Sequence, residues 1–301
     1  MKKIRLGLAV LATMVGAASV SASIFTGASG LNKNFSTAGN WDVVPTNGAL
    51  IDAFGVTNAS VSSPAIVDSA WTNTVANVKL HSVTGYGSGT SYVEVVSGGN
   101  FKVTSLAVGN AANAAFDGVL TVRKGGAITN MFANSGVLSI GGGTAGMVGK
   151  MFVEAGASLR QTRVDLNQYG LLSFTFDSNS VSTLNLSGTS VLTNKLDGLL
   201  QVDLAALTTS GTYTLINSTN SNLLIGGTMR TWLDGVGGSY TNTGDFANAN
   251  FQVLNGGTKK WTLALADGNQ DLTLTVIPEP TTISLFIVAG IGAFALRRVV
   301  R

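Results

Sequence analysis

The sequence predicts an all-β protein built as a parallel β-helix, or solenoid, with an antiparallel β cap at its C-terminal end. Three observations lead to this prediction. Similar phrases recur in the middle of the chain, and within each phrase apolar residues alternate with polar ones, as they do in strands. Only 11% of the 301 residues are charged. The 38 glycines and many Asn, Ser and Thr residues therefore supply the turns and the polar surface.

The repeated phrase reads YVEVVSGGNFKV, VLTVRKGGAITN and KMFVEAGASLRQ, with Gly99, Gly126 and Gly156 marking a corner, 27 and 30 residues apart. A second short strand phrase follows each corner: LAVGN from Leu106, LSIGG from Leu138 and VDLNQ from Val164. One such coil cannot bury its inward side chains alone, so we expect stacked coils that share one core. An antiparallel β-sandwich of hairpins would satisfy the same alternation and stays open as the alternative.

The pattern changes near Asp203. The phrases GTYTLIN and FQVLNGGTKKWTLALADGNQDLTLTV look antiparallel, and we expect them to cap the solenoid, because an unpaired sheet edge invites aggregation. The predicted organisation has four parts: a signal peptide (1–22), a β-solenoid repeat region (23–202), an antiparallel β cap (203–277) and a terminal segment (278–301).

The N-terminal segment MKKIRLGLAVLATMVGAASVSA has a basic start, a short apolar run and a small-residue end. These three features predict a secretory signal peptide, helical in its apolar part and cleaved after Ala22 or close by. The alternative is an N-terminal membrane anchor, which the short apolar run disfavours.

The C-terminal segment holds 16 uncharged residues, 281–296, followed by Arg297, Arg298 and Arg301. As a helix the apolar run would be roughly 24 Å long, marginally enough to span a bilayer. The arginines would hold the end of the chain on the cytoplasmic side. We therefore expect a transmembrane helix here, with the body of the protein exported.

Pro278-Glu279-Pro280, the apolar run and the terminal arginine cluster together resemble the PEP-CTERM sorting signal of Gram-negative bacteria. The resemblance implies recognition by an exosortase after the export machinery has acted, and cleavage near the motif. The protein would pass through an inner-membrane intermediate to the cell surface or the medium. Pro278, Glu279 and Pro280 would then be substrate residues, and the two prolines would keep the segment extended and unpaired.

The repeats also resemble the autotransporter-associated β-strand repeats of surface proteins. The entry phrase NFSTAGNWDVVPTNGALIDAFG, which starts at Asn34, is part of this resemblance. In such proteins an Asn-Trp pair followed by a Pro and an Asp opens the first strands.

Charge and cysteine content exclude several classes of function. Six of the 18 cationic residues lie in the two end segments, which leaves 12 cations against 15 acids, so the net charge of +3 reflects targeting. No cluster of Lys or Arg with interleaved aromatics appears inside, and we expect no nucleic-acid partner. The absence of Cys removes disulfides, thiolate chemistry and Cys-based metal sites.

Few residues suggest catalysis, and we expect no cofactor or bound metal. His81 is the only histidine and has no nucleophile elbow to serve. Arg160, Arg163 and Asp165 lie close together, and alternation places Arg163 and Asp165 on one side of a strand as an exposed ion pair. The segment 267–271 resembles part of a calcium loop but lacks the downstream Glu, which favours a hairpin turn. Gly141-Gly142-Gly143-Thr144 has no following Lys-Ser/Thr, so a corner is expected rather than a phosphate site.

These features predict a non-enzymatic structural or adhesive protein of the cell envelope or of an extracellular polysaccharide matrix. Tyr86, Tyr92, Trp232 and Tyr240 are candidates for stacking on sugars. The alternative is a polysaccharide-active lyase or hydrolase on the same fold. That alternative requires a cleft on the solenoid flank with two carboxylates, or a cation and a carboxylate, within catalytic reach. A permanently anchored membrane protein is a third possibility, and it would retain residues 281–301.

Overall fold

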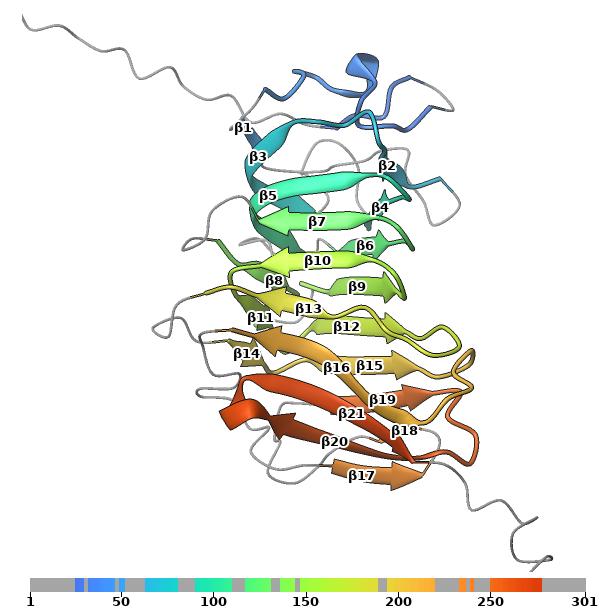
Figure 1. The fold of residues 1–301 in the computed structure, drawn as a ribbon. Coiled ribbons are helices and arrows are strands. Elements are labelled where there is room, and N and C mark those ends of the chain that lie inside the picture. The colour runs from blue at the N-terminus through green and yellow to red at the C-terminus, as the bar shows by residue number, and fades with distance from the viewer. Residues whose placement is uncertain are drawn as a thin grey trace, which may run out of the picture.

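The computed structural model contains almost only β structure, arranged as an elongated stack of strands (Figure 1). Among the described residues the two helical elements are single 3₁₀ turns, η1 (Ala38–Asn40) and η2 (Asp267–Asn269). The residues that the structure describes are 25–29, 32–46, 49–51, 63–80, 90–109, 117–130, 136–143, 147–188, 194–219, 233–236, 239–240 and 250–277.

The first face of the stack is a sheet of parallel strands with one antiparallel strand at its end. In spatial order its strands are β2 (Ala65–Val67), β4 (Ser91–Val95), β6 (Gly118–Val122), β9 (Gly149–Glu154), β12 (Gly170–Thr175), β15 (Leu199–Asp203), β19 (Asn250–Leu254) and the antiparallel β18 (Ser239–Tyr240).

The second and third faces belong to one branched sheet, because the long strand β5 (Asn100–Val108) pairs with a different strand in each half. The second face continues from β5 through β7 (Ala127–Asn130), β10 (Ser158–Gln161), β13 (Leu184–Leu186) and β16 (Gly211–Ser218). The third face continues through β8 (Leu138–Ile140), β11 (Val164–Leu166) and β14 (Lys195–Leu196). At the N-terminal end, β3 (Thr74–Leu80) lies on β5, and β1 (Ala49–Ile51) lies on β3.

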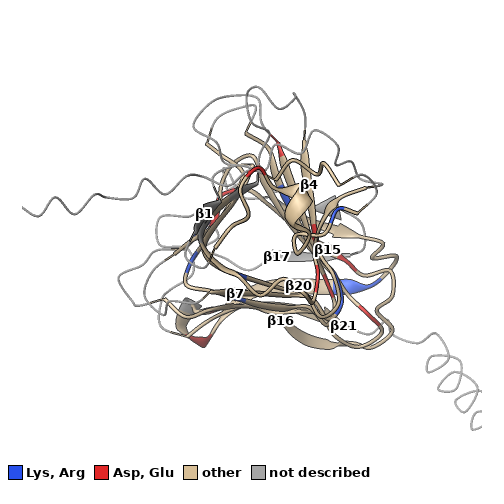
Figure 2. Ribbon diagram, turned by 90° about the horizontal axis from the view of Figure 1, so that it is seen from above, with Lys and Arg blue, Asp and Glu red and all other residues tan. Residues whose placement is uncertain are grey.

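The chain passes once over each face per turn, and it completes about four turns, β4–β5, β6–β7–β8, β9–β10–β11 and β12–β13–β14. Viewed along the axis, the three faces enclose a roughly triangular interior (Figure 2). Successive turns pair in parallel, as the sequence predicts for a solenoid, whereas a sandwich of hairpins would pair neighbouring strands antiparallel. The sandwich alternative is therefore wrong.

Buried side chains form continuous ladders along the axis. Strands of the first face alternate buried and outward residues, and their inward hydrophobic side chains that are described are at most 1% exposed. The two ladders of this face are Val93–Leu120–Met151–Leu172–Leu200–Phe251 and Val95–Val122–Val153–Phe174–Val202–Val253. A single turn cannot bury its inward side chains, but stacked turns cover each other's side chains and form one continuous core.

The corner between the first and second faces is built by stacked glycines. The Gly98 N–H donates to the Gly125 carbonyl, and the Gly125 N–H donates to the Gly156 carbonyl, each over 3.0 Å. The three glycines have φ of +79°, +78° and +85°, where L side chains are strained. The predicted alignment of Gly99 and Gly126 with Gly156 is therefore wrong by one residue. Gly-Gly pairs in two repeats allow either alignment, and only the backbone conformation selects the first glycine of each pair.

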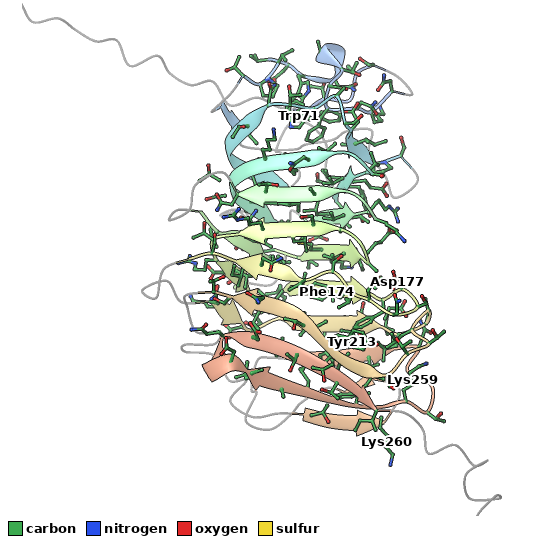
Figure 3. The ribbon with its side chains drawn as sticks, viewed as in Figure 1. Trp71, Phe174, Asp177, Tyr213, Lys259 and Lys260 are labelled. Carbon is green, nitrogen blue, oxygen red and sulfur yellow. The ribbon has the colours of Figure 1, made fainter. Side chains whose placement is uncertain are left out.

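The entry phrase forms an aromatic cluster at the N-terminal end of the core. The Phe35 ring lies 5.0–5.8 Å, between centroids, from the rings of Phe25, Trp41, Trp71 and Phe101. Figure 3 shows Trp71 at this end of the stack. The fully buried Asn40 donates its side-chain amide to the carbonyls of residues 32 and 34, and it accepts from the N–H of residue 29. The Asn-Trp pair thus helps to cover the first turn.

The C-terminal end combines parallel and antiparallel pairing. The strands β21 (Asp271–Ile277), β20 (Lys260–Ala266) and β17 (Leu233–Val236) pair antiparallel beyond β16. Trp261 is 1% exposed and packs on Phe251 of the last core ladder. The antiparallel hairpin β20–β21 is confirmed. However, β16 and β19 also pair in parallel with β13 and β15, so parallel stacking continues past residue 203.

The two end segments lie outside the described residues. This applies to the predicted signal peptide and its helix at 1–22, to Pro278, Glu279 and Pro280, and to the predicted transmembrane helix at 281–296 with Arg297, Arg298 and Arg301. Among the residues that are described, no helix has the length and apolar character needed to cross a membrane.

Candidate functional site

A shallow hollow on the outer surface of the first face is the best candidate site. Alternation turns every second residue of β4, β6 and β9 outward, and in-register pairing aligns these residues across the strands. One row is Tyr92–Val119–Lys150, and the next is Glu94–Thr121–Phe152. The hollow has a volume of about 350 Å³ and is named the flank depression. Its lining residues are Pro64, Tyr92, Val93, Glu94, Val119, Thr121, Arg123, Lys150 and Phe152.

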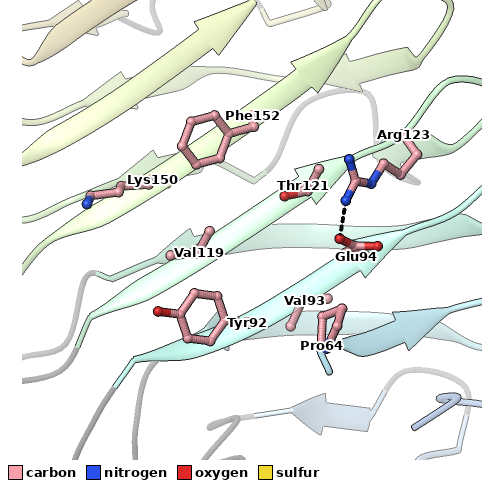
Figure 4. Close-up of a pocket in the computed structure, with 9 residues that line it drawn as sticks. All are labelled: Pro64, Tyr92, Val93, Glu94, Val119, Thr121, Arg123, Lys150 and Phe152. Carbon is pink, nitrogen blue, oxygen red and sulfur yellow. Dashed lines mark hydrogen bonds and ion pairs between the residues drawn. The ribbon is translucent and has the colours of Figure 1, made fainter. Parts of the chain in front are cut away.

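Two aromatic rings stand in the flank depression. Tyr92 comes from β4 and Phe152 from β9, two strands further along the axis (Figure 4). Both residues are half-buried, so part of each ring remains open to solvent. The separation of the two strands is about 10 Å. The rings therefore offer two separate apolar surfaces inside an otherwise polar hollow.

A three-membered ion-pair network borders the rings. Arg123 follows β6 at the corner, and its Nη2 donates to Glu94 Oε1 over 2.5 Å while its Nη1 donates to Glu154 Oε1 over 2.6 Å. Glu154 Oε2 also accepts the backbone N–H of Lys124 over 3.0 Å. One guanidinium thus joins carboxylates from the turns before and after its own.

The network favours the charged forms of Arg123 and Glu154. Hydrogen bonds to Glu94 and Glu154 raise the pKa of Arg123 well above its ordinary value. For Glu154, partial burial works to raise the pKa, but the hydrogen bonds from Arg123 and Lys124 outweigh it, and the pKa is lowered. A general acid at neutral pH needs a raised carboxyl pKa, and a general base needs a pKa close to the working pH. Neither Arg123 nor Glu154 meets that requirement.

Lys150 lies on the opposite side of the flank depression from Arg123 (Figure 4). Its side chain is exposed and makes no ion pair with a described residue. The flank depression therefore has a cation available on one side and a carboxylate-rich network on the other.

Beyond β9 the same outward row becomes uncharged. Ser173 on β12 donates its hydroxyl to Gln201 Oε1 over 2.9 Å, and Gln201 donates its amide to Gln252 Oε1 over 2.6 Å. These residues continue the row of Glu94, Thr121 and Phe152 along the axis. A polar track therefore extends from the flank depression towards the C-terminal end.

The flank depression meets the geometric requirement that the sequence analysis set for an enzyme on this fold. A cation and two carboxylates do lie together on the solenoid flank. However, both carboxylates hydrogen-bond to the same guanidinium, and the pKa shifts of Arg123 and Glu154 favour fixed charge over proton transfer. The arrangement is suited to holding a polar ligand through stacking, ion pairing and hydrogen bonds.

The predicted pair of Arg163 and Asp165 forms on the third face, with Arg163 Nη2 2.9 Å from Asp165 Oδ2. It is more buried than expected, since the Asp165 side chain is 15% exposed. Burial raises the pKa of Asp165 and outweighs the lowering by Arg163 and Lys195. Arg160 is exposed on β10 of the second face, and the structure gives it no ion pair with Asp165.

The remaining sequence candidates give no further site. Segment 267–271 forms the turn between β20 and β21, with η2 inside it, as expected for a hairpin. Among the described residues, no group of three or more His, Cys, Asp or Glu is arranged to hold a metal. Gly141 stands at a bend with φ of +68°, and its neighbours Gly142 and Gly143 are not in a helix. His81 lies outside the described residues.

Of the four aromatics proposed for sugar stacking, only Tyr92 belongs to the flank depression. Tyr86 and Trp232 lie outside the described residues, and Tyr240 is described in its backbone only. Sequence reasoning missed Phe152, Lys150 and the Arg123 network. The sequence did contain a signal for the network. Aligning the repeats pairs Val122 with Val153, and so places the next residues, Arg123 and Glu154, side by side on neighbouring turns.

Comparisons with known proteins add no assignment: no family model matches the chain, and no curated protein or solved structure matches it.

Proposed function

We propose that this chain is an exported, non-enzymatic structural or adhesive protein of the cell envelope or of an extracellular polysaccharide matrix. An exosortase recognises its C-terminal signal and cleaves near Pro278-Glu279-Pro280. The apolar segment 281–296 holds the precursor in the inner membrane until cleavage, and Arg297, Arg298 and Arg301 keep its end in the cytoplasm. The solenoid is the cargo that is delivered.

One observation carries this proposal. The last strand, β21, ends at Ile277, immediately before Pro278. Cleavage at or after the motif would therefore remove no strand that the structure describes. It would also leave intact the antiparallel strands that cover the C-terminal end of the core. A sorting signal placed there can be removed from a folded body without exposing that core.

The non-enzymatic part of the proposal rests on the flank depression. Its hydrogen bonds favour the ionised forms of Arg123 and Glu154, so neither residue is suited to act as a general acid at neutral pH. A rigid β-solenoid with polar outward rows is suited to passive attachment, because a repeated surface offers many weak contacts at once.

Mass spectrometry of the protein from cells and from medium tests the sorting step. We expect the exported form to lack the RRVVR end, and a Glu279→Ala variant to retain it and to accumulate in the inner membrane. Asp267→Ala is the matched control, since it removes an acid near the same end in an exposed turn and should leave processing unchanged. An intact RRVVR end in every wild-type fraction would refute the processing step and support a permanently anchored protein.

A polysaccharide-active lyase or hydrolase is the second candidate, favoured by the charged residues in the flank depression. It predicts new reducing ends, or an unsaturated product that absorbs ultraviolet light, when the protein is incubated with polysaccharide. Loss of that product in Glu94→Gln and Arg123→Ala variants would establish catalysis and overturn the non-enzymatic proposal.

A further inference from the structure

We propose that the flank depression is a binding site for one stretch of a uronate-containing polysaccharide. The inference rests on the proposed delivery of this protein to a polysaccharide-rich environment, and it names the class of ligand that the site takes. Three properties of the site carry it: two partly open rings, a cation that forms no ion pair with a described residue, and carboxylate oxygens that can accept hydrogen bonds.

The rings fit a ligand that is apolar on its faces and polar at its edges. A pyranose ring has this character, because its C–H groups point to the two faces and its hydroxyls point outward. Tyr92 and Phe152 are half-buried. Their strands, β4 and β9, lie about 10 Å apart, and Phe152 is also about 7 Å further along its strand than Lys150, the residue level with Tyr92. Neighbouring strands are about 4.8 Å apart, which is comparable to one sugar unit along an extended chain. The two rings can therefore contact sugars in nearby positions of the same strand.

The charges identify the kind of sugar. Lys150 is exposed and pairs with no described acid, so it can bind an anionic group. On the other side, two carboxylates share one guanidinium, which leaves a net negative charge. Glu94 Oε1 accepts from Arg123, whereas its Oε2 accepts no hydrogen bond from a described residue. A uronate sugar matches both sides, because its carboxylate can pair with Lys150 while its hydroxyls donate to Glu94.

The same charges disfavour other ligands. A neutral polysaccharide would leave Lys150 without an ion pair. Polyphosphate or a highly sulfated polymer carries more charge per unit length than a polyuronate, and would bring more negative charge against Glu94 and Glu154. Gln201 and Gln252 are partly exposed further along the same row and give a longer strand further polar contacts, whereas Ser173, next to Phe152, is only 3% exposed. The polysaccharide then lies along the solenoid axis.

Binding of the full chain, kept in detergent, to soluble polygalacturonate tests the proposal. We expect wild-type protein to bind, and full methyl esterification of the same polymer to weaken binding about tenfold, because the ion pair with Lys150 is lost. Lys150→Ala should lose about tenfold for the free polyuronate and nothing for the esterified form. The double variant Tyr92→Ala/Phe152→Ala should lose at least tenfold for both forms.

Two controls make the test specific. Lys260→Ala removes an equally exposed lysine from the C-terminal hairpin, where Figure 3 shows it, and should not change binding. Circular dichroism and thermal unfolding identify any variant that fails to fold, and Lys150→Ala keeps the test valid because its exposed side chain supports no core contact. Wild-type affinity in the Lys150→Ala variant would overturn the proposal. An equal loss in Lys260→Ala, or equal binding of dextran sulfate, would also overturn it.

The outcome is independent of the sorting experiment. Binding is measured on purified protein and does not depend on cleavage, whereas processing is read from the C-terminus in cells. Failure of one therefore does not imply failure of the other.

Discussion

The two arginine–carboxylate sites of this protein use the same chemistry in different surroundings. Arg123 joins Glu94 and Glu154 on the first face, where the side chains are 45%, 19% and 35% exposed. Arg163 joins Asp165 on the third face, where the side chains are 29% and 15% exposed. The first site is a shared network at the surface, and the second is a single pair that is largely shielded from water.

Hydrogen bonding separates the two sites further. Both oxygens of Glu154 accept hydrogen bonds, whereas Asp165 Oδ1 and Arg163 Nε are buried and have no partner among the described residues. The pKa of Glu154 is accordingly lowered, and that of Asp165 is raised. An ion pair therefore stabilises charge only where water or hydrogen bonds replace the lost solvation. The first site favours ionised side chains at the surface, where a ligand can reach them. In the second site, burial of the Asp165 carboxylate costs free energy.

The largest effect should come from Arg163→Ala. The substitution leaves the Asp165 carboxylate half-buried without its direct partner, and we expect the free energy of unfolding to fall by about 2 kcal/mol. Chemical denaturation at neutral pH measures this change. Arg160→Ala is the control, since Arg160 is exposed on a nearby strand and should cost less than about 0.5 kcal/mol. An equal fall in the free energy of unfolding for Arg163→Ala and Arg160→Ala would mean that the buried ion pair of Arg163 and Asp165 contributes nothing special to stability.

Asp165→Asn should have a smaller effect, within about 1 kcal/mol, because the folded state already disfavours the charged carboxylate. Adding Asp165→Asn to Arg163→Ala should recover part of the lost stability, since it removes the uncompensated charge. A double-mutant cycle by denaturation measures that recovery. Strictly additive losses would contradict the assigned coupling.

The pH dependence of stability should differ in sign between the sites. The lowered pKa of Glu154 stabilises the fold above its ordinary value of 4.5, and this contribution is lost as pH falls through the folded-state pKa. The raised pKa of Asp165 has the opposite effect. Holding this carboxylate ionised in the folded state lowers stability near neutral pH, and this cost disappears as pH falls through the folded-state pKa towards 3.8.

Denaturation of wild type, Glu154→Gln and Asp165→Asn from neutral pH to about pH 3 tests these signs. The advantage of wild type over Glu154→Gln should shrink with falling pH. The free energy of unfolding of Asp165→Asn should fall relative to that of wild type over the same range. Parallel curves for all three proteins would refute the opposite pKa shifts.

The smallest effect on stability should come from Arg123→Ala, with a loss of about 0.5 kcal/mol, because exposed ion pairs contribute little. Added salt should reduce even this loss, since it screens the charges. Thermal unfolding at low and high salt provides the measurement. A loss as large as that of Arg163→Ala would show that the network is a structural element of the first face rather than part of a binding surface.

The sequence predicted more of the fold than of the site. Alternation within the repeats identified the strands, and the phrases from Leu106, Leu138 and Val164 do pair in register on the third face. Alternation also predicted the pair of Arg163 and Asp165, which are two residues apart. The partners of Arg123 are 29 and 31 residues away in sequence, so they become neighbours only when the register between turns is known.

The sequence alone determined that the chain consists of short strands with alternating inward and outward residues and repeated corners, because these are local properties. It left a solenoid and a sandwich open, and the parallel pairing between turns decided for the solenoid. The tertiary structure decided which residues lie side by side on the flank and how strongly each charge is solvated. It also decided which glycine of each Gly-Gly pair occupies the corner. These outcomes depend on pairing between turns, since a shift of one residue would place different side chains on the same face.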